Sequence, residues 1–523
     1  MKKSAMLVFA FCAGLILLDA QGRPGNSPGS NQRSLAPTPP MGWNSWDCYG
    51  PSVTENEVKA NADYMAKQMV RYGWKYIVVD IQWYEPKAGP HGYRKDAELT
   101  MDEYGRLMPA PNRFPSSAGG KGFKPLADYV HGKGLKFGIH VVRGIPRQAV
   151  QNNLPVYRSK FRAEEIADKN SICSWLTDMY GVDTGKPGAQ EYYDAILALY
   201  AGWGVDYIKA DDMSSPYHAG EIEALSRAIK RCGRPIVLSL SPGPADLKFA
   251  DHLRANAQLW RISGDFWDRW QDLKRQFDLC HRWIPYIGPD TWPDADMLPL
   301  GRIGIRAERG NDRQTRLTQS EQYALVSLWC IFRSPLMMGG DLPSSDQFTL
   351  SLLTNEEVLA VNQQSTHNRE LFARGNEIAW TADVPGTRSK YLALFNFGDD
   401  GPARIEVPWS ELGLSGQCAV RDLWQRRESG RFEKIFTTTI QVHGGGLFKV
   451  TPTGISGTGA ITSKLFEIGG NWFLWNFEVM APVPEIQEGF EVGFHRHSIA
   501  EEHLLDSFGR EDRGALQIAE RAV

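Results

Sequence analysis

Four short apolar runs of the chain end in an aspartate, and each run has the length of a β-strand. An aspartate at such a position can cap the following helix by accepting hydrogen bonds from its backbone amides. Helix capping accounts for one such aspartate more easily than for four together. Carboxylates that converge on one rim must be solvated, paired with cations or used in chemistry. These aspartates are Asp80, Asp211, Asp265 and Asp290.

Cations and aromatic side chains accompany these aspartates. Lys209 precedes Asp211 by two residues, so both side chains would leave a strand on the same side, and Arg261 precedes Asp265 by four residues. A hollow lined by carboxylates, cations and flat indoles suits a sugar, whose hydroxyls donate and accept hydrogen bonds and whose C–H face packs on an aromatic ring. The tryptophans near other predicted strand ends are Trp46, Trp83 and Trp292.

Cleavage of a glycosidic bond needs two carboxyl groups in different protonation states. The positive charge of Lys209 is expected to lower the pKa of Asp211, which predicts an ionised nucleophile there. Asp265 is followed by Phe266 and Trp267, an apolar setting that favours the protonated acid. We therefore assign Asp211 as the nucleophile and Asp265 as the acid/base.

The elements that must position these side chains recur regularly over residues 38–362. Short apolar runs alternate there with amphipathic segments such as Glu55–Tyr72, Gln190–Gly202 and Glu221–Cys232. This alternation is typical of a parallel sheet with helices on both faces, and eight units predict an α/β fold, a (β/α)8 TIM barrel. The predicted strands are Met41–Trp46, Tyr76–Asp80, Leu135–His140, Val205–Lys209, Ile236–Leu240, Leu259–Ile262, Ile284–Ile287 and Pro335–Met338.

Residues 363–452 follow a different pattern, in which short alternating runs are separated by Gly, Pro, Asp and Asn turns. This pattern predicts a C-terminal antiparallel β-sandwich. Residues 453–523 resemble neither half and are interpreted as a tail, in which His495 and His497 lack a third metal ligand. The predicted strands of the sandwich are Ile378–Ala382, Tyr391–Asn396, Ala403–Val407, Ala419–Asp422, Thr437–Val442 and Leu447–Val450.

The N-terminus has the layout of a secretory signal peptide over residues 1–20. Lys2 and Lys3 precede the apolar run Ala5–Leu18, and Ala20 offers a small residue for cleavage. Residues 21–37 are interpreted as a flexible linker. We therefore expect a secreted or periplasmic protein with no membrane-inserted segment once the signal is removed.

Charge and cysteine content exclude several function classes. The 523 residues carry 58 Lys and Arg against 61 Asp and Glu, a net charge of −3, which gives no reason to expect a nucleic-acid partner. The six cysteines beyond the signal peptide are widely spaced without a CxxC pair, so a zinc site is not expected. An exported chain permits disulfides, of which we expect at most one or two. The oligomeric state stays open.

Seven fragments, in this order, resemble glycoside hydrolase family 27, the α-galactosidases (melibiases) and α-N-acetylgalactosaminidases. The resemblance covers residues 37–452 and therefore includes the C-terminal β domain. The fragments are Pro39–Trp46, Tyr76–Asp80, Leu135–His140, Trp203–Asp211, Trp260–Asp265, Asp294–Met297 and Ser334–Leu342.

The resemblance implies a retaining α-glycosidase that needs neither a metal nor an organic cofactor. Asp211 occupies the nucleophile position of the K-x-D motif, and Asp265 occupies the acid/base position of R-x-x-x-D. The activity expected first is release of terminal α-D-galactosyl residues from a small or glycan substrate. The residues expected to contact that sugar are Trp46, Trp83, Asp80, Lys209, His140, Ser241, Arg261 and Asp296.

Departures from the family pattern bear on substrate choice. Galactosidases of the family carry two adjacent acids after the second strand, whereas Asp80 is followed here by Ile81. Loss of an acid near the C5 substituent leaves β-L-arabinopyranosidase activity open, because that sugar is galactose without its hydroxymethyl group. After the fifth strand, where galactosidases often carry a bulky acid near the 2-substituent, this chain has the small residues of Ser239–Gly243, which leave room for the 2-acetamido group of N-acetylgalactosamine. Met213 replaces a disulfide cysteine two residues after the nucleophile.

Two further alternatives stay open at this point. His140 ends its predicted strand in the expected pocket, where it could bind a hydroxyl or orient an acid. A carbohydrate-binding protein without catalysis, built on the same barrel, is the competing function class. The presence of both Asp211 and Asp265 argues against it.

Overall fold

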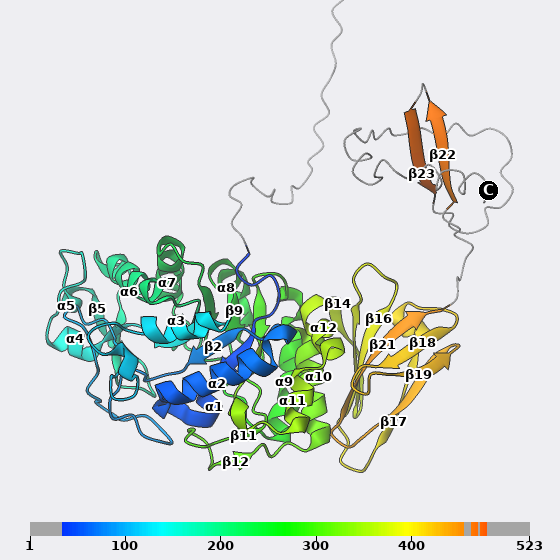
Figure 1. Cartoon of the computed structure of the whole chain (residues 1–523), viewed down its shortest axis with the longest axis horizontal. Coiled ribbons are helices and arrows are strands. Elements are labelled where there is room, and N and C mark those ends of the chain that lie inside the picture. Colours follow the sequence, from blue (N-terminus) through cyan, green and yellow to red (C-terminus); the bar gives the residue numbers. More distant parts are fainter. Residues whose placement is uncertain (1–33, 454–461, 469–470, 478–523) are drawn as a thin grey trace, which may run out of the picture. The chain divides into compact units, whose positions relative to one another are not determined.

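The computed structural model describes residues 34–453, 462–468 and 471–477 (Figure 1). The chain divides into two compact units, residues 1–454 and residues 455–523. In the second unit β22 (Thr462–Ile468) and β23 (Asn471–Phe477) pair as an antiparallel hairpin, so part of the predicted tail has regular structure. The predicted signal peptide and the pair His495 and His497 lie outside the described residues.

Eight strands form the central sheet of the first unit, and every neighbouring pair is parallel. The order is β10-β9-β8-β7-β3-β2-β1-β13. Leu298, just after β10, forms a parallel bridge with Met338 of β13 and so joins the two ends of the sheet, as the predicted barrel requires. The strands are β1 (Met41–Asn44), β2 (Tyr76–Val79), β3 (Lys136–Val142), β7 (Tyr207–Asp211), β8 (Val237–Leu240), β9 (Leu259–Arg261), β10 (Trp292–Asp294) and β13 (Leu336–Met338).

One predicted strand is wrong. Ile284–Ile287 does not enter the sheet, because Ile284–Tyr286 forms a 3-10 helix at the end of α9 (Trp270–Trp283). Pro285 lacks the amide proton that a central strand must donate, and it fits the first turn of a helix. The seventh strand is β10 instead, so Asp290 does not end a strand; its Oδ1 accepts a hydrogen bond from the Ala36 amide at 2.6 Å.

Helices between the strands follow the amphipathic segments of the sequence and begin at recognisable caps. Thr318 and Glu321 form a capping box at the start of α10 (Gln319–Phe332), and Thr54 with Glu57 does the same for α2 (Glu55–Gln68). The apolar faces of these helices bury against the barrel. The other long helices are α3 (Lys124–Gly132), α6 (Ala189–Trp203), α7 (Ala219–Arg231) and α12 (Glu356–Gln364).

Additional short elements extend the loops that follow the strands. The loop after β1 contains α1 (Trp46–Tyr49). The loop after β3 carries a small sheet of β4 (Ile145–Pro146), β6 (Met179–Val182) and β5 (Ala167–Ile172). The loop after β10 carries the hairpin of β11 (Arg302–Ile303) and β12 (Arg313–Gln314). These loops supply the side chains around the rim, where barrel chemistry lies.

The C-terminal domain is antiparallel, as predicted, with a six-stranded sheet of order β14-β15-β16-β21-β18-β19 and a two-stranded sheet of β17 and β20. The two outer strands of the larger sheet, β14 (Thr366–Arg374) and β19 (Arg427–Phe432), were not predicted, because their polar sequences lack an apolar alternation. The other strands are β15 (Glu377–Asp383), β16 (Lys390–Asn396), β17 (Ala403–Pro408), β18 (Cys418–Asp422), β20 (Ile435–Ile440) and β21 (Gly445–Pro452).

Specific contacts hold this domain against the barrel helices. Arg421 Nε and Nη2 each lie 2.7 Å from a carboxylate oxygen of Glu357 in α12. Trp424 Nε1 donates to Ser327 Oγ of α10 at 2.9 Å. All six cysteines of the described part are free thiols, so no disulfide supports this part of the fold. Among the described helices, none combines the length and apolarity that a membrane crossing requires.

Candidate active site

Asp211, the predicted nucleophile, is the last residue of β7 and meets His140 of the neighbouring strand β3. His140 Nε2 lies 3.0 Å from Asp211 Oδ2. Burial opposes ionisation of Asp211, but the hydrogen bond and charge of His140 and the charge of Lys209 outweigh it and hold the pKa of Asp211 well below its usual value. Asp211 therefore remains an ionised acceptor, and His140 orients an acid, one of its two predicted roles.

Replacing His140 by glutamine is expected to move the acid limb of the pH profile of kcat/KM to higher pH. That limb reports the essential base of the free enzyme, which must be ionised. Removal of a partner that lowers the pKa of Asp211 raises that pKa, so activity is lost at a higher pH as the solution is acidified. We expect a displacement of about one unit or more, measured as kcat/KM across the acidic range.

His252→Gln is the matched control, because His252 Nε2 also lies 3.0 Å from a carboxylate, Glu223 Oε1, but on the outer helices. Its acid limb should coincide with that of the unchanged protein. An unmoved limb in His140→Gln would show that His140 does not set the ionisation of Asp211.

Asp80 and Lys209 form a second polar group beside Asp211. Lys209 Nζ lies 2.9 Å from Asp80 Oδ2, and Asn44 Nδ2 donates to the same oxygen at 2.7 Å. Burial raises the pKa of Asp80, but the charges of Lys209 and His140 reverse this and lower it below its usual value. The pair is thus a fixed donor and acceptor that could bind adjacent sugar hydroxyls.

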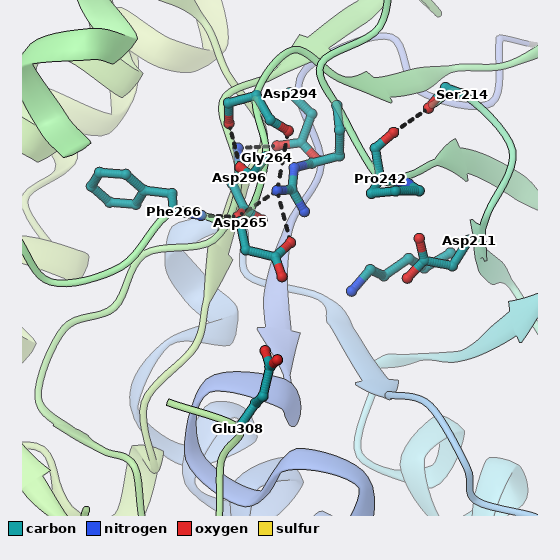
Figure 2. Close-up of polar contacts among 12 residues, drawn as sticks. Asp211, Ser214, Pro242, Gly264, Asp265, Phe266, Asp294, Asp296 and Glu308 are labelled. Carbon is teal, nitrogen blue, oxygen red and sulfur yellow. Dashed lines mark hydrogen bonds and ion pairs between the residues drawn. The ribbon is translucent and has the colours of Figure 1, made fainter. Parts of the chain in front are cut away.

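Asp265, the predicted acid/base, follows β9 and stands beside Arg261. Arg261 Nη2 lies 3.3 Å from Asp265 Oδ1 and 2.7 Å from Asp296 Oδ2. Asp296 also accepts from the Phe266 amide at 2.7 Å, and burial raises its pKa although Arg261 opposes this. Figure 2 shows the carboxylates of Asp265 and Asp211 on either side of one open space. The Asp265 side chain is 37% exposed, against 14% for Asp211.

A small hollow of about 20 Å³ lies among Lys209, Arg261 and Asp296, and neither Asp211 nor Asp265 lines it. Ser241 Oγ and Arg261 Nε border it and are both buried without a hydrogen-bond partner. Buried polar atoms are normally paired, so unpaired donors facing a hollow are suited to a polar ligand. The lining residues are Asn44, Val78, Tyr207, Lys209, Ser239, Ser241, Arg261, Asp294, Asp296, Met297 and Met337.

A glycine brings the Ser241 loop close to the loop that carries Asp265. A Cβ at Gly243 would lie 2.1 Å from the carbonyl oxygen of Ser263, so no larger residue fits there without movement. Ser214 Oγ donates to the Pro242 carbonyl at 2.8 Å and holds the same loop from the β7 side (Figure 2). The loops after β7, β8 and β9 are therefore packed into one wall of the site.

Both tryptophans predicted to contact the sugar are buried, and they differ in the side chains that they contact. Trp46 stacks with Tyr93, their ring centroids 5.6 Å apart at an interplanar angle of 15°. Trp83 lies in the core: it is fully buried, packs against Phe123 and Trp203, and donates its Nε1–H to the His140 carbonyl at 2.7 Å. A tryptophan just after a strand can turn beneath the loops instead of toward the rim.

Three residues near the site were not predicted as functional. Asn44 ends β1 beside Asp80, and its place in the conspicuous Met41–Trp46 run was a usable signal. Tyr93 and Glu308 come from long loops after β2 and β10, which show no periodicity from which their position could be inferred. Burial, with the charges of Asp211, Asp80, Glu308 and Asp265, raises the pKa of Tyr93.

The assembled groups can cleave a glycosidic bond. Arg261 contacts Asp265, and Figure 2 shows the carboxylates of Asp265 and Asp211 facing the same space. Asp211 is held ionised and is mostly buried, whereas the Asp265 side chain is more exposed to water. The described residues include no group of three or more His, Cys, Asp or Glu side chains arranged to bind a metal ion.

Comparison with known families matches both domains. The model of the alpha galactosidase A family matches residues 38–184 and 151–364. The model of the alpha galactosidase C-terminal beta sandwich domain matches residues 375–450.

Solved structures and curated sequences of glycosidases are also similar to this chain. A GH27 β-L-arabinopyranosidase from Geobacillus stearothermophilus is 52% identical with a TM-score of 0.79, covering 81% of this chain and 98% of that chain. A Bacillus halodurans protein described as a candidate alpha-N-acetylgalactosaminidase is 50% identical with a TM-score of 0.73, covering 80% and 98%. An alpha-galactosidase from Coffea arabica is 31% identical, covering 80% of this chain and 95% of the relative.

Proposed function

The chain belongs to glycoside hydrolase family 27, and on that premise we propose that it is a retaining exo-glycosidase for terminal β-L-arabinopyranosides and α-D-galactosides, with arabinopyranosides preferred. The two sugars share their ring configuration and differ by the hydroxymethyl group at C5. The observation that carries the preference is the isoleucine beside Asp80. Family membership sets aside the alternative of a carbohydrate-binding protein without catalysis.

The proposed reaction has two displacements. A carboxylate oxygen of Asp211 bonds to the anomeric carbon while the glycosidic C–O bond breaks, and Asp265 gives its proton to the departing oxygen. Asp265 then takes a proton from water, whose oxygen attacks the anomeric carbon and breaks the ester bond to Asp211. Two inversions at one carbon retain the configuration of the substrate, and Asp265 ends protonated as it began.

The remaining site residues have distinct tasks in this proposal. Lys209 and Asp80 are a donor and an acceptor 2.9 Å apart and suit vicinal sugar hydroxyls. Ser241 and Arg261 offer the unpaired donors that border the hollow. The indole of Trp46 offers an apolar surface to the C–H face of the ring. None of these tasks requires a metal or an organic cofactor.

Ile81 explains why the arabinopyranoside is preferred. Its side chain is almost fully buried, and its amide donates to Asp80 Oδ1 at 2.9 Å, which fixes it beside the sugar-binding carboxylate. A hydrocarbon side chain cannot accept the hydrogen bond of a 6-hydroxyl. An apolar pocket rejects an added hydroxyl only moderately, by roughly 1–3 kcal/mol, so galactosides should remain slower substrates.

A panel of p-nitrophenyl glycosides tests the proposal. We expect the highest kcat/KM for β-L-arabinopyranoside and a lower value for α-D-galactoside. Proton NMR spectra should show that the sugar released first has the anomeric configuration of the substrate. Ser241, which borders the hollow with a small side chain, makes α-N-acetylgalactosaminide the second candidate. Activity on that glycoside alone would overturn the preference, and no hydrolysis of any of the three would overturn the function.

Replacing Ile81 by aspartate is expected to shift the ratio of kcat/KM values toward galactoside. The new carboxylate can accept a hydrogen bond from the 6-hydroxyl, which arabinopyranose lacks, so the ratio should rise about tenfold or more. Ile81→Asn supplies the same acceptor without a buried charge, and Ile81→Leu is the control that should leave the ratio unchanged. An unchanged ratio in both polar variants, with both proteins folded, would show that position 81 does not select the sugar.

We also infer from the N-terminal sequence that the protein is exported. Lys2, Lys3 and the run Ala5–Leu18 support cleavage by signal peptidase. N-terminal sequencing of mature protein should begin at or shortly after Gln21. A mature chain that begins at Met1 would contradict export through this segment.

A further inference from the structure

We propose that Glu308 and Tyr93 form a binding site for a neutral sugar on the leaving-group side of the reaction. The inference rests on the proposed function, because it uses Asp265 as the acid that faces the departing oxygen. It adds the residues that would bind the second sugar of the substrate.

Glu308 faces the acid/base from the opposite side of the space. It lies in the loop between β11 and β12, and Figure 2 shows its carboxylate pointing toward that of Asp265. The Glu308 side chain is 36% exposed, nearly the same as Asp265. Both carboxylates thus border the open part of the site, whereas Asp211 lies deeper.

The oxygens of Glu308 are available to a ligand. Within the described residues its one ion pair is with Arg309, whose Nε lies 3.7 Å from Glu308 Oε2, beyond hydrogen-bond distance. Arg309 is itself more than half exposed, so this pair is weak. A carboxylate with free acceptor oxygens at an open rim suits hydroxyl donors.

The loop that carries Glu308 is held firmly in place. Arg306 Nη2 lies 2.7 Å from both carboxylate oxygens of Glu57, and its amide donates to the Cys48 carbonyl at 2.9 Å. His91 makes two further hydrogen bonds to this loop. Its amide donates to the Arg306 carbonyl at 3.1 Å, and its Nδ1 lies 2.7 Å from the Ala307 carbonyl. Glu308 directly follows this anchor.

His91 also positions Tyr93, because the same residue ties the loop after β2 to the loop after β10. The Tyr93 ring stacks with Trp46 on one side and is tilted by 40° against Trp175, at a centroid distance of 5.4 Å. The charges of Asp211, Asp265 and Glu308 all act on its hydroxyl. Because Trp46 and Trp175 pack against its ring, Tyr93 offers its hydroxyl to a ligand, and Glu308 offers its carboxylate. Both are polar groups that can bind sugar hydroxyls.

Geometry assigns these groups to the leaving side. Asp211 attacks from one face of the anomeric carbon, and Asp265 protonates the oxygen that departs, so the group attached to that oxygen extends past Asp265 into the open space. Glu308 borders that space. Its negative charge favours a neutral hydroxyl-rich sugar and disfavours uronic acids or phosphorylated groups.

Transfer to an added sugar tests this site. In a retaining mechanism an acceptor in the leaving-group site competes with water for the glycosyl-enzyme. With p-nitrophenyl β-L-arabinopyranoside as donor and D-glucose as acceptor, the ratio of disaccharide formed to arabinose released measures binding there. We expect Glu308→Leu to lower this ratio about ten- to a hundredfold.

Two variants make the test specific. Glu308→Gln keeps an acceptor oxygen without the charge and should give an intermediate ratio. Glu98→Leu removes an exposed carboxylate elsewhere on the surface and should change nothing. An unchanged ratio in Glu308→Leu would overturn the inference. A loss of p-nitrophenol release as large as the loss of transfer would do the same, as would the absence of transfer by the unchanged protein at high glucose. Failure to cleave any of the three p-nitrophenyl glycosides would instead overturn the proposed function.

Discussion

Replacing Asp211 by alanine should lower kcat by about 10⁴-fold or more on every glycoside that the protein cleaves. Asp211 forms the bond to the anomeric carbon in the proposed reaction. His140 and Lys209 keep this carboxylate ionised, which the reaction requires. Initial rates of p-nitrophenol release measure the loss.

Azide adds a diagnostic result to the Asp211→Ala variant. A small anion can occupy the space left by the side chain and attack the anomeric carbon from the same face. The product should be a glycosyl azide of inverted configuration, because only one displacement then occurs. Azide that restores no activity, in a variant that retains substantial hydrolysis by itself, would show that Asp211 is not the nucleophile.

Asp290→Asn is the matched control for Asp211→Ala. The sequence places Asp290 after an apolar run, just as it places Asp211, but in the structure its carboxylate binds the Ala36 amide outside the site. Asparagine tolerates the positive φ of 62° at this position. We expect near-normal kcat, and a large loss would contradict the placement of Asp290 outside the catalytic group.

Replacing Asp265 by alanine should reduce activity by an amount that depends on the leaving group. General acid catalysis is worth about 10²–10⁴-fold, and a sugar alcohol needs the proton far more than p-nitrophenolate does. We expect the full loss of kcat/KM on a disaccharide and a much smaller loss on the p-nitrophenyl glycoside. The measurement is the ratio of the two kcat/KM values in the variant and in the unchanged protein.

The two substrates serve as internal controls for one another, because misfolding would reduce both rates in proportion. Asp265→Asn keeps the size of the side chain and its contact with Arg261 and should show the same dependence on the leaving group. Equal losses on both substrates in both variants would assign Asp265 a binding role instead of proton transfer.

The barrel, and the placement at its rim of the two aspartates that we propose as catalytic, were predictable because local sequence patterns encode them. Buried parallel strands read as continuous apolar runs, and their C-terminal ends meet on one rim whatever the connecting loops do. Lys209 and Asp211, two residues apart on β7, must share a face. The pairing of Asp265 with Arg261 likewise followed from spacing within one strand and its turn.

The remaining features depend on tertiary packing that no local pattern records. The apolar run Ile284–Ile287 has the composition of a strand, but Pro285 and the preceding helix make it a 3-10 turn. Trp83 follows a strand as Trp46 does, and only the aromatic cluster around it decides that it is buried. Tyr93 and Glu308 approach the site through contacts of His91 between loops more than two hundred residues apart, a distance at which spacing carries no information.

Trapping the covalent intermediate tests the two-aspartate mechanism most directly. In Asp265→Ala the first displacement still proceeds with a p-nitrophenyl leaving group, but water lacks its base, so the glycosyl-enzyme should accumulate. Peptide mass spectrometry of this variant after mixing with p-nitrophenyl β-L-arabinopyranoside should find one arabinosyl group attached to the peptide that contains Asp211, at Asp211 itself. A sugar attached to another residue, or turnover of substrate with an inverted product and no attachment, would contradict the mechanism.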